Sequence, residues 1–408
     1  MNILIIGGSG NEPSANSICV RNMALEFLYR GDKVWILASG DECVKESKEI
    51  GGAILWQVPE TWYSSFTKRV FHNPSVLKLL CFKIVSALRH LLLLFTYPMT
   101  EPIRSRKVLK KAKVLVKDND IKLVLAIHNN YANIYSGIEL KKIYGDRIKV
   151  VSYHLDLRTA SINTFVPVRE YVYHHALSSI AEESKIVDKI LIPYSGQAEV
   201  ESIIGLELRK FCFVGFPVYI EDGKTEPCKL PFKEGFVNIC YIGTLSRDNR
   251  NPRYVLSLLE QAEEQMGQKL MVHFWGNVGE VEKILEESPV AIYHGMVENG
   301  YVQYIQDNSD FLLNIGNAIA YSMLPSKVFG LFSTGKPIIN VINHPKDATF
   351  PFFKRYNHSI DIKEYSPSPE DVNNIVEGIK KMMITPRKVV NGLFDDFKPE
   401  TICDEILE

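Results

Sequence analysis

The sequence lacks the features that mark disulfide-rich, metal-binding or repetitive proteins. Its 7 cysteines are scattered over 408 residues, and none belongs to a C-x-x-C pair or a Cys/His cluster. We therefore expect reduced thiols and no bound metal. Short repeats and low-complexity tracts are missing too. No charged leader precedes the first apolar strand, which indicates a cytoplasmic protein.

Net charge is also nearly absent, at −1 for the whole chain. The two halves nevertheless differ, because residues 1–218 carry 28 Lys and Arg against 21 Asp and Glu, and residues 219–408 carry 19 against 27. The N-terminal part thus favours an anionic partner. We expect no nucleic-acid partner.

Apolar strand patterns alternate with helical ones along most of the chain. A strand at 2–6, a helix at 14–30 and a strand at 33–38 form a βαβ unit, which predicts a parallel sheet. Further strands are expected at 121–127, 148–153, 189–193, 211–215, 237–242, 270–275, 290–293, 311–315 and 337–341, with helices at 252–266 and 278–287. Pro and Gly punctuate a polar linker at 217–235 between the two series.

The alternation and the length together predict the fold class. A chain of 408 residues exceeds one typical core. We expect an α/β protein with two Rossmann-like, doubly wound domains facing each other across a cleft. Their predicted bounds are 1–218 and 236–389, and a C-terminal helix of about 390–408 is expected to pack back on the first domain.

The first glycine turn, Gly7-Gly8-Ser9-Gly10, invites comparison with a dinucleotide site. The G-x-G-x-x-G fingerprint counted from Gly8 would need a glycine where Pro13 stands, so an NAD site is disfavoured. Two interpretations of Gly8 stay open: close approach of the backbone to a bound donor, or a tight strand-to-helix turn with no ligand.

An apolar stretch at 77–95 departs from the alternation. Lys78, Lys83 and Arg89 interrupt it centrally, which argues against a membrane span. A basic cluster follows up to residue 113. Residues 77–113 therefore predict either peripheral docking on anionic lipid or a core helix followed by a solvated basic helix.

Residues 321–339 read Y-S-M-L-P-S-K-V-F-G-L-F-S-T-G-K-P-I-I. This stretch resembles the donor-binding signature of GT-B glycosyltransferases, particularly those of glycosyltransferase family 4. The Gly-Gly turn, residues 30–34 and residues 241–245 resemble further parts of the family pattern. The resemblance implies a nucleotide-sugar donor, UDP- or GDP-linked, bound by the C-terminal domain, an acceptor bound by the N-terminal domain, and no cofactor.

The same residues suit a phosphate site on physical grounds. Pro325 and Ser326 begin a helix whose first amides are free, and Lys327 adds a positive charge there. Gly243 and Arg250 follow a strand of the same predicted sheet, at the edge where ligands bind. The alternatives are a solvated lysine and a surface arginine. The expected donor-binding residues are Gly8, Gly243, Thr244, Arg247, Gly276, Asn277, Asn314, Gly316, Asn317, Ser322, Leu324, Pro325 and Ser326.

The family resemblance implies transfer with retention of configuration, in which the departing diphosphate is stabilised electrostatically. His154-Leu155-Asp156 resembles the family's region facing the donor sugar, so His154 would bond a sugar hydroxyl and Asp156 would orient either this histidine or the acceptor. The alternative for His154 is a strand-capping histidine without a ligand. The expected catalytic residues are His154, Asp156, Arg250 and Lys327.

Two positions depart from the family pattern. Ser322 and Gly330 stand where family members carry two glutamates. The favoured function is sugar transfer to a saccharide acceptor, lipid-linked, in cell-surface polysaccharide synthesis at the inner face of the membrane. A catalytically silent partner of a transferase and a sugar-nucleotide epimerase remain as alternatives.

Overall fold

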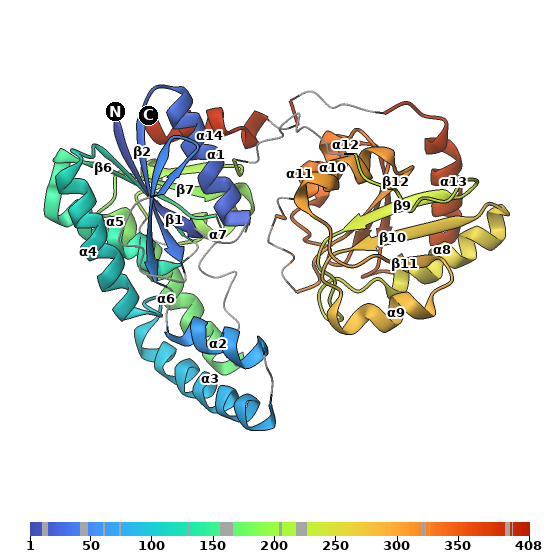
Figure 1. The fold of residues 1–408 in the computed structure, drawn as a ribbon, viewed down its shortest axis with the longest axis horizontal. Coiled ribbons are helices and arrows are strands. Elements are labelled where there is room, and N and C mark those ends of the chain that lie inside the picture. Colours follow the sequence, from blue (N-terminus) through green and yellow to red (C-terminus); the bar gives the residue numbers. More distant parts are fainter. Residues whose placement is uncertain are drawn as a thin grey trace. The chain divides into compact units, whose positions relative to one another are not determined.

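The computed structural model divides the chain into two compact units. It describes residues 1–9, 15–40, 48–59, 62–72, 75–128, 130–155, 166–203, 206–217, 227–319, 321, 324–325, 327–387, 392–393 and 395–408. Unit 1 comprises Met1–Tyr219 and Asp396–Glu408, and unit 2 comprises Ile220–Asp395. Figure 1 shows that each unit is a sheet covered by helices on both faces.

The sheet of unit 1 has the strand order β3-β4-β2-β1-β5-β6-β7-β8. All neighbours are parallel except β3 and β4. Its strands are β1 (Asn2–Ser9), β2 (Lys33–Gly40), β3 (Lys48–Ile50), β4 (Ala53–Pro59), β5 (Leu123–Ile127), β6 (Lys149–Tyr153), β7 (Lys189–Pro193) and β8 (Phe211–Val214). Its helices are α1 (Ala15–Tyr29), α2 (Trp62–His72), α3 (Val76–Thr96), α4 (Pro102–Asp118), α5 (Tyr131–Tyr144), α6 (Val166–Ser184), α7 (Gln197–Glu201) and α14 (Pro399–Leu407).

The sheet of unit 2 has the order β11-β10-β9-β12-β13-β14, and all its neighbours are parallel. Its strands are β9 (Val237–Ile242), β10 (Leu270–Trp275), β11 (Ala291–Tyr293), β12 (Phe311–Ile315), β13 (Ile338–Ile342) and β14 (Ser359–Lys363). Its helices are α8 (Arg253–Met266), α9 (Glu282–Glu287), α10 (Asn299–Asn308), α11 (Lys327–Ser333), α12 (Phe350–Tyr356) and α13 (Asp371–Met383).

Both sheets are doubly wound, which confirms the predicted α/β class. In unit 1 the chain winds outward from β1 in one direction and from β5 in the other, and in unit 2 it does so from β9 and β12. The strands are almost uninterrupted apolar runs because helices cover both faces. The sequence prediction omitted β3, β4 and β14, which lie toward the outer parts of the sheets.

The described parts of the segments near the boundary between the units each pack into one of the two units. Arg30 on α1 forms an ion pair with Asp404 on α14 (Nη1–Oδ1 2.6 Å), and Ile402 and Ile406 are fully buried. Residues from 227 onward lie in unit 2, where the Phe232 ring is 5.0 Å from that of His273. The second half of the expected linker is thus part of the packing of unit 2.

Helices α2 and α3 extend away from the sheet of unit 1 (Figure 1). Phe82 on the inner side of α3 contacts Phe71 on α2, with ring centroids 5.2 Å apart. The rest of α3 is largely exposed, so the expectation of a core helix at 77–95 is wrong. No helix in the described parts of the chain combines the length and the apolar character needed to cross a bilayer.

Candidate functional site

The point where the sheet of unit 2 reverses its winding lies between β9 and β12. At such a point the connections after the two strands run apart and leave a crevice at the carboxyl ends, where α/β proteins bind ligands. Gly243 directly follows β9, and Gly316 directly follows β12. Several of the residues expected from the sequence therefore lie at this edge.

Two glycines allow the backbone to pack tightly there. Gly243 has φ +155° and Gly276 has φ +120°, and a Cβ on Gly276 would lie 2.2 Å from the carbonyl oxygen of Gly243. The Gly243 amide donates to the carbonyl of Trp275 over 2.9 Å. Only glycine fits at Gly276, because the contact it makes is with main chain that cannot give way.

Lys327, the first residue of α11, reaches back to this turn. Its Nζ donates to the Tyr241 hydroxyl over 3.4 Å and lies 4.6 Å from the centre of that ring. A Cβ on Gly243 would lie 3.1 Å from the same Nζ. Burial and the nearby Arg250 cation hold the pKa of Lys327 well below the ordinary lysine value. The site thus holds an amine whose charged form has no carboxylate partner among the described residues.

Arg250 is fixed by the loop that follows Gly243. Its Nε donates to Asn317 Oδ1 over 2.8 Å, and Asn249 Nδ2 donates to the same oxygen over 3.1 Å. Reciprocal backbone bonds between Ser246 and Arg250 close the loop. Burial raises the pKa of Tyr241 to about 12, against the opposing effect of Arg250.

We call Lys327 and Arg250 the cation pair. As far as the structure describes the chain, neither forms an ion pair with a carboxylate. Two like charges held together in a partly buried crevice favour a bound anion.

The remaining expected residues of unit 2 divide by position. Thr244, Arg247 and Asn277 are exposed at the same carboxyl edge. Asn314 is instead buried within the sheet, and its amide donates to Asn340 over 2.9 Å. We therefore assign Asn314 to the fold. Leu324 is buried and Pro325 is half-buried, whereas Ser322 and Ser326 lie outside the described residues.

Two residues of this site were missed in the sequence. Tyr241 points its hydroxyl at Lys327 and also donates to the carbonyl of Thr244 over 3.0 Å. Asp347, in the loop after β13, is buried, and burial raises its pKa. A Cβ on Gly316 would meet Asp347 Oδ2 at 2.5 Å. The polar run that follows the apolar strand β13 was the available signal for Asp347.

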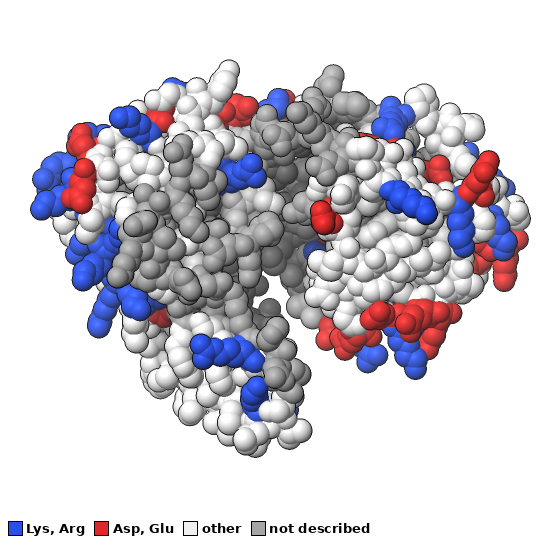
Figure 2. All heavy atoms as spheres, in the orientation of Figure 1, with Lys and Arg blue, Asp and Glu red and all other residues white. Residues whose placement is uncertain are grey.

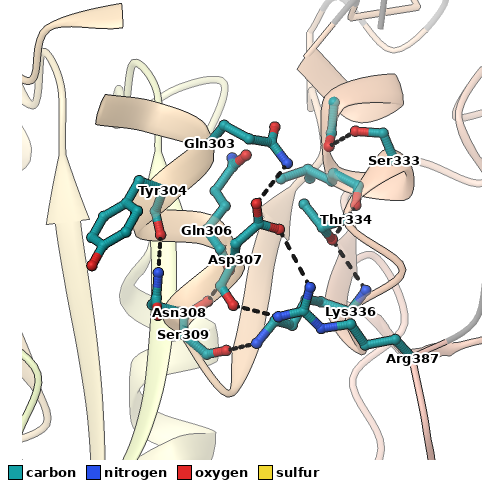
Figure 3. Close-up of polar contacts among 12 residues, drawn as sticks. Gln303, Tyr304, Gln306, Asp307, Asn308, Ser309, Ser333, Thr334, Lys336 and Arg387 are labelled. Carbon is teal, nitrogen blue, oxygen red and sulfur yellow. Dashed lines mark hydrogen bonds and ion pairs between the residues drawn. The ribbon is translucent and has the colours of Figure 1, made fainter. Parts of the chain in front are cut away.

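The last part of the 321–339 signature lies at the opposite, amino edge of the sheet. Lys336 Nζ donates to the carbonyl of Ser309, and Thr334 Oγ1 accepts from the Lys336 amide over 3.1 Å. Arg387 reaches the Asp307 carbonyl over 2.6 Å beside them (Figure 3). This network joins the turn before β13 to the end of α10, so residues 334–337 serve the fold.

In unit 1, His154 is an internal residue. Its side chain is 0% exposed, and Nε2 lies 3.2 Å from Oε1 of Glu183, which is also fully buried. The half-buried His128 stacks on it with ring centroids 5.2 Å apart. Asp156 lies outside the described residues. The buried position of His154 therefore favours a structural role over contact with a sugar.

Gly8 is the penultimate residue of β1, at the reversal point of the unit 1 sheet. It has φ +78°, and a Cβ there would contact Val20 of α1 at 3.4 Å. A Cβ on Gly7 would lie 2.8 Å from Ile127 Cβ on β5. Both glycines thus fit the packing of the turn, and residues 10–14 of the loop are not described.

Comparison with known proteins establishes the fold. No protein-family profile and no curated protein matches the sequence. The chain is similar to the solved apo form of the lipopolysaccharide outer core galactosyltransferase WaaB, with 14% identity and a TM-score of 0.57 over 100% of this chain and 98% of that one. It is also similar to Anabaena Alr3699/HepE in complex with UDP and glucose, with 12% identity and a TM-score of 0.59 over 100% and 98%.

A third similar structure is a UDP-N-acetylglucosamine 2-epimerase, with 11% identity and a TM-score of 0.55 over 100% of this chain and 96% of that one. At these identities the similarity shows the fold, and the chain has the GT-B fold.

The lowered pKa of Lys327 predicts a pH dependence of stability. The unfolded chain holds the proton with an ordinary lysine pKa of 10.5, more tightly than the folded one. The free energy of unfolding should therefore rise with pH from the lowered pKa up to about 10.5. Lys327→Met should remove that rise and increase stability at neutral pH by on the order of 1 kcal/mol.

Urea unfolding at several pH values measures the free energy of unfolding, with the exposed Lys346→Met variant as the control. Equal pH profiles for wild type and Lys327→Met would contradict it.

The buried His154–Glu183 pair predicts a structural cost. His154→Ala leaves the Glu183 carboxyl without this partner inside unit 1, which should lower the free energy of unfolding by about 3 kcal/mol. His174→Ala, an exposed histidine on α6, should change it by less than about 0.5 kcal/mol. Chemical denaturation compares the two variants. If they prove equally stable, the pair does not hold the unit together.

Proposed function

We propose that this chain is a glycosyltransferase that moves a sugar from a nucleoside-diphosphate donor to a saccharide acceptor. The observation that carries the proposal is the cation pair at the reversal point of the unit 2 sheet. Lys327 and Arg250 place positive charge beside the glycine turn at Gly243, where a diphosphate can approach the main chain.

The cation pair suits the chemistry of this reaction. When the bond between the sugar and the diphosphate breaks, negative charge grows on the departing phosphate oxygens, and fixed cations stabilise that state more than the ground state. Arg250 is held by Asn317 and the Ser246 backbone, so its guanidinium is oriented in advance. We propose that the pair supplies this charge without a metal, and that the phosphate accepts the acceptor proton in a retaining transfer.

The solved relatives support the choice of substrates. The HepE structure contains UDP and glucose, and WaaB is named for galactosyl transfer to lipopolysaccharide. We propose a UDP- or GDP-linked sugar as the donor and a lipid-linked saccharide of the cell surface as the acceptor. Exposed apolar residues on α3 and basic residues on α4 would place unit 1 against the inner face of the membrane.

A catalytically silent protein is the second candidate. Gly330 replaces the glutamate expected from the family, and a Cβ there would meet nothing within 4 Å. Space for a side chain is thus present while the carboxylate is missing. The epimerase relative shares the fold, but an epimerase would need further acid and base groups, and the carboxylate at the site, Asp347, is buried.

Donor binding tests the proposal. Calorimetric titration with UDP and GDP should show binding of one of them to the wild type, weakened at least about tenfold by Lys327→Met or Arg250→Met. Arg253→Met removes an exposed arginine three residues along and should leave the affinity unchanged. Because a bound diphosphate favours the charged form of Lys327, binding should raise the pKa of Lys327, which titrations at several pH values in two buffers of different ionisation enthalpy detect as a pH-dependent proton uptake.

Transfer of labelled sugar to membrane lipids then separates the two candidates. A transferase binds the donor and modifies an acceptor, whereas a silent partner does not transfer. Absence of binding for both nucleotides, or equal affinity in the Lys327→Met and Arg253→Met variants, would overturn the proposal.

A further inference from the structure

A cavity of about 290 Å³ lies in unit 1 at the base of α2 and α3. It is bounded by the end of β4 at Pro59, the first residues of α2, Arg89 on α3 and the start of α4. This is the carboxyl edge of the unit 1 sheet, on the side of its outer strands β2 and β4. The volume is at the low end for ligand sites and suits a small headgroup better than a nucleotide.

The cavity carries an excess of positive charge. Arg89, Arg104 and Lys107 line it together with a single acidic residue, Glu101. Glu101 is shared, since Arg104 Nη1 lies 3.7 Å from one carboxylate oxygen and Arg89 Nη2 lies 4.0 Å from the other. The sum of these four charges is about +2, which favours an anionic ligand.

Arg104 has one side-chain N–H that no described group accepts from. The residue is 9% exposed, and its Nη2 donates to the Ser39 hydroxyl on β2. Its Nε is buried and has no hydrogen-bond partner among the groups that the structure describes. A buried guanidinium N–H left unbonded costs free energy unless a ligand or water accepts from it.

The start of α4 adds to the positive potential. This helix has 17 residues, begins at Pro102, and has no acidic residue in its first turn. No side chain caps its first amides, so the partial positive charge of the helix start is available beside Arg104.

The rim of the cavity is apolar rather than polar. Trp62 and Ile103 line it and are 68% and 72% exposed. Helix α3, whose Arg89 lines the cavity, carries nine exposed large apolar residues among its described side chains, namely Val76, Leu77, Leu79, Leu80, Ile84, Leu88, Leu91, Leu92 and Phe95. A ligand with a charged head and an apolar tail fits such a junction.

The charge around this surface indicates what covers it. Residues 62–117 contain 12 Lys and Arg and one acidic residue. Figure 2 shows basic side chains gathered over α4 and a mainly uncharged surface over α3. An exposed apolar helix flanked by basic residues is complementary to an anionic lipid surface.

We propose that this cavity binds the phosphoryl headgroup of an anionic lipid whose tail lies in the bilayer along α3. Arg104 and Lys107 hold the phosphoryl oxygens, and Arg89 completes the wall while stacking on Tyr63, with its Cζ 4.2 Å from the ring centre. We further propose that this lipid carries the acceptor saccharide, and only that part of the inference rests on the proposed function.

Vesicle binding tests the proposal with the full chain. Phosphatidylcholine vesicles are prepared with phosphatidic acid, which exposes a phosphate monoester, or with phosphatidylserine at matched surface charge. The wild type should bind the phosphatidic acid vesicles about tenfold more tightly, because only that headgroup enters the cavity. Lys107→Met should abolish this preference. Lys110→Met removes an exposed charge from the same helix outside the cavity and should weaken binding to both vesicles equally.

Arg89→Met provides a second cavity variant and should also abolish the preference. Millimolar inorganic phosphate should leave it intact, since a free phosphate has no apolar tail to lie along α3 and so binds more weakly than the lipid. Loss of the preference in phosphate would assign the cavity to a free anion and overturn the lipid proposal. If Lys107→Met and Lys110→Met have equal effects, binding depends only on the surface charge of the protein. That result would also overturn the lipid proposal. UDP titration of the same preparations shows separately whether the proposed function stands.

Discussion

The proposed activity depends on two cations kept close together without a carboxylate between them. Lys327 is brought to the glycine turn by the start of α11, and Arg250 by the tight loop after β9. Burial, and then the repulsion from Arg250, lower the pKa of Lys327, and a bound anion offsets the cost of charging this group. The rest of unit 2 can be understood as the framework that holds this arrangement at the reversal point of the sheet.

The two edges of that sheet separate ligand binding from stability. At the carboxyl edge, Gly243 and Gly276 bring main chain into close contact and leave Lys327 beside the crevice. At the amino edge, Lys336 and Thr334 join the turn before β13 to the end of α10. One continuous sequence signature therefore contains residues of both kinds, because α11 crosses from one edge of the sheet to the other.

The sequence predicted the strands well because buried parallel strands are short apolar runs, and β7, β9, β10 and β12 have the expected bounds. It also predicted that Lys327, Gly243 and Arg250 would share an edge, which follows from the direction of parallel strands. Side-chain partners could not be read in the same way. Glu183 meets His154 across 29 residues of chain, and Asn314 is bonded inside the sheet by Asn340. The apolar pattern of α3 predicted a helix, but periodicity alone did not tell that its apolar side faces outward.

The most direct measurement of the central claim is a crystal structure of the chain with UDP or GDP bound. We expect the diphosphate at the carboxyl edge of the unit 2 sheet, within hydrogen-bonding distance of Lys327 Nζ and the Arg250 guanidinium, with its oxygens near the main chain at Gly243. A nucleotide bound elsewhere on the chain, with the cation pair empty or paired to a carboxylate, would contradict it.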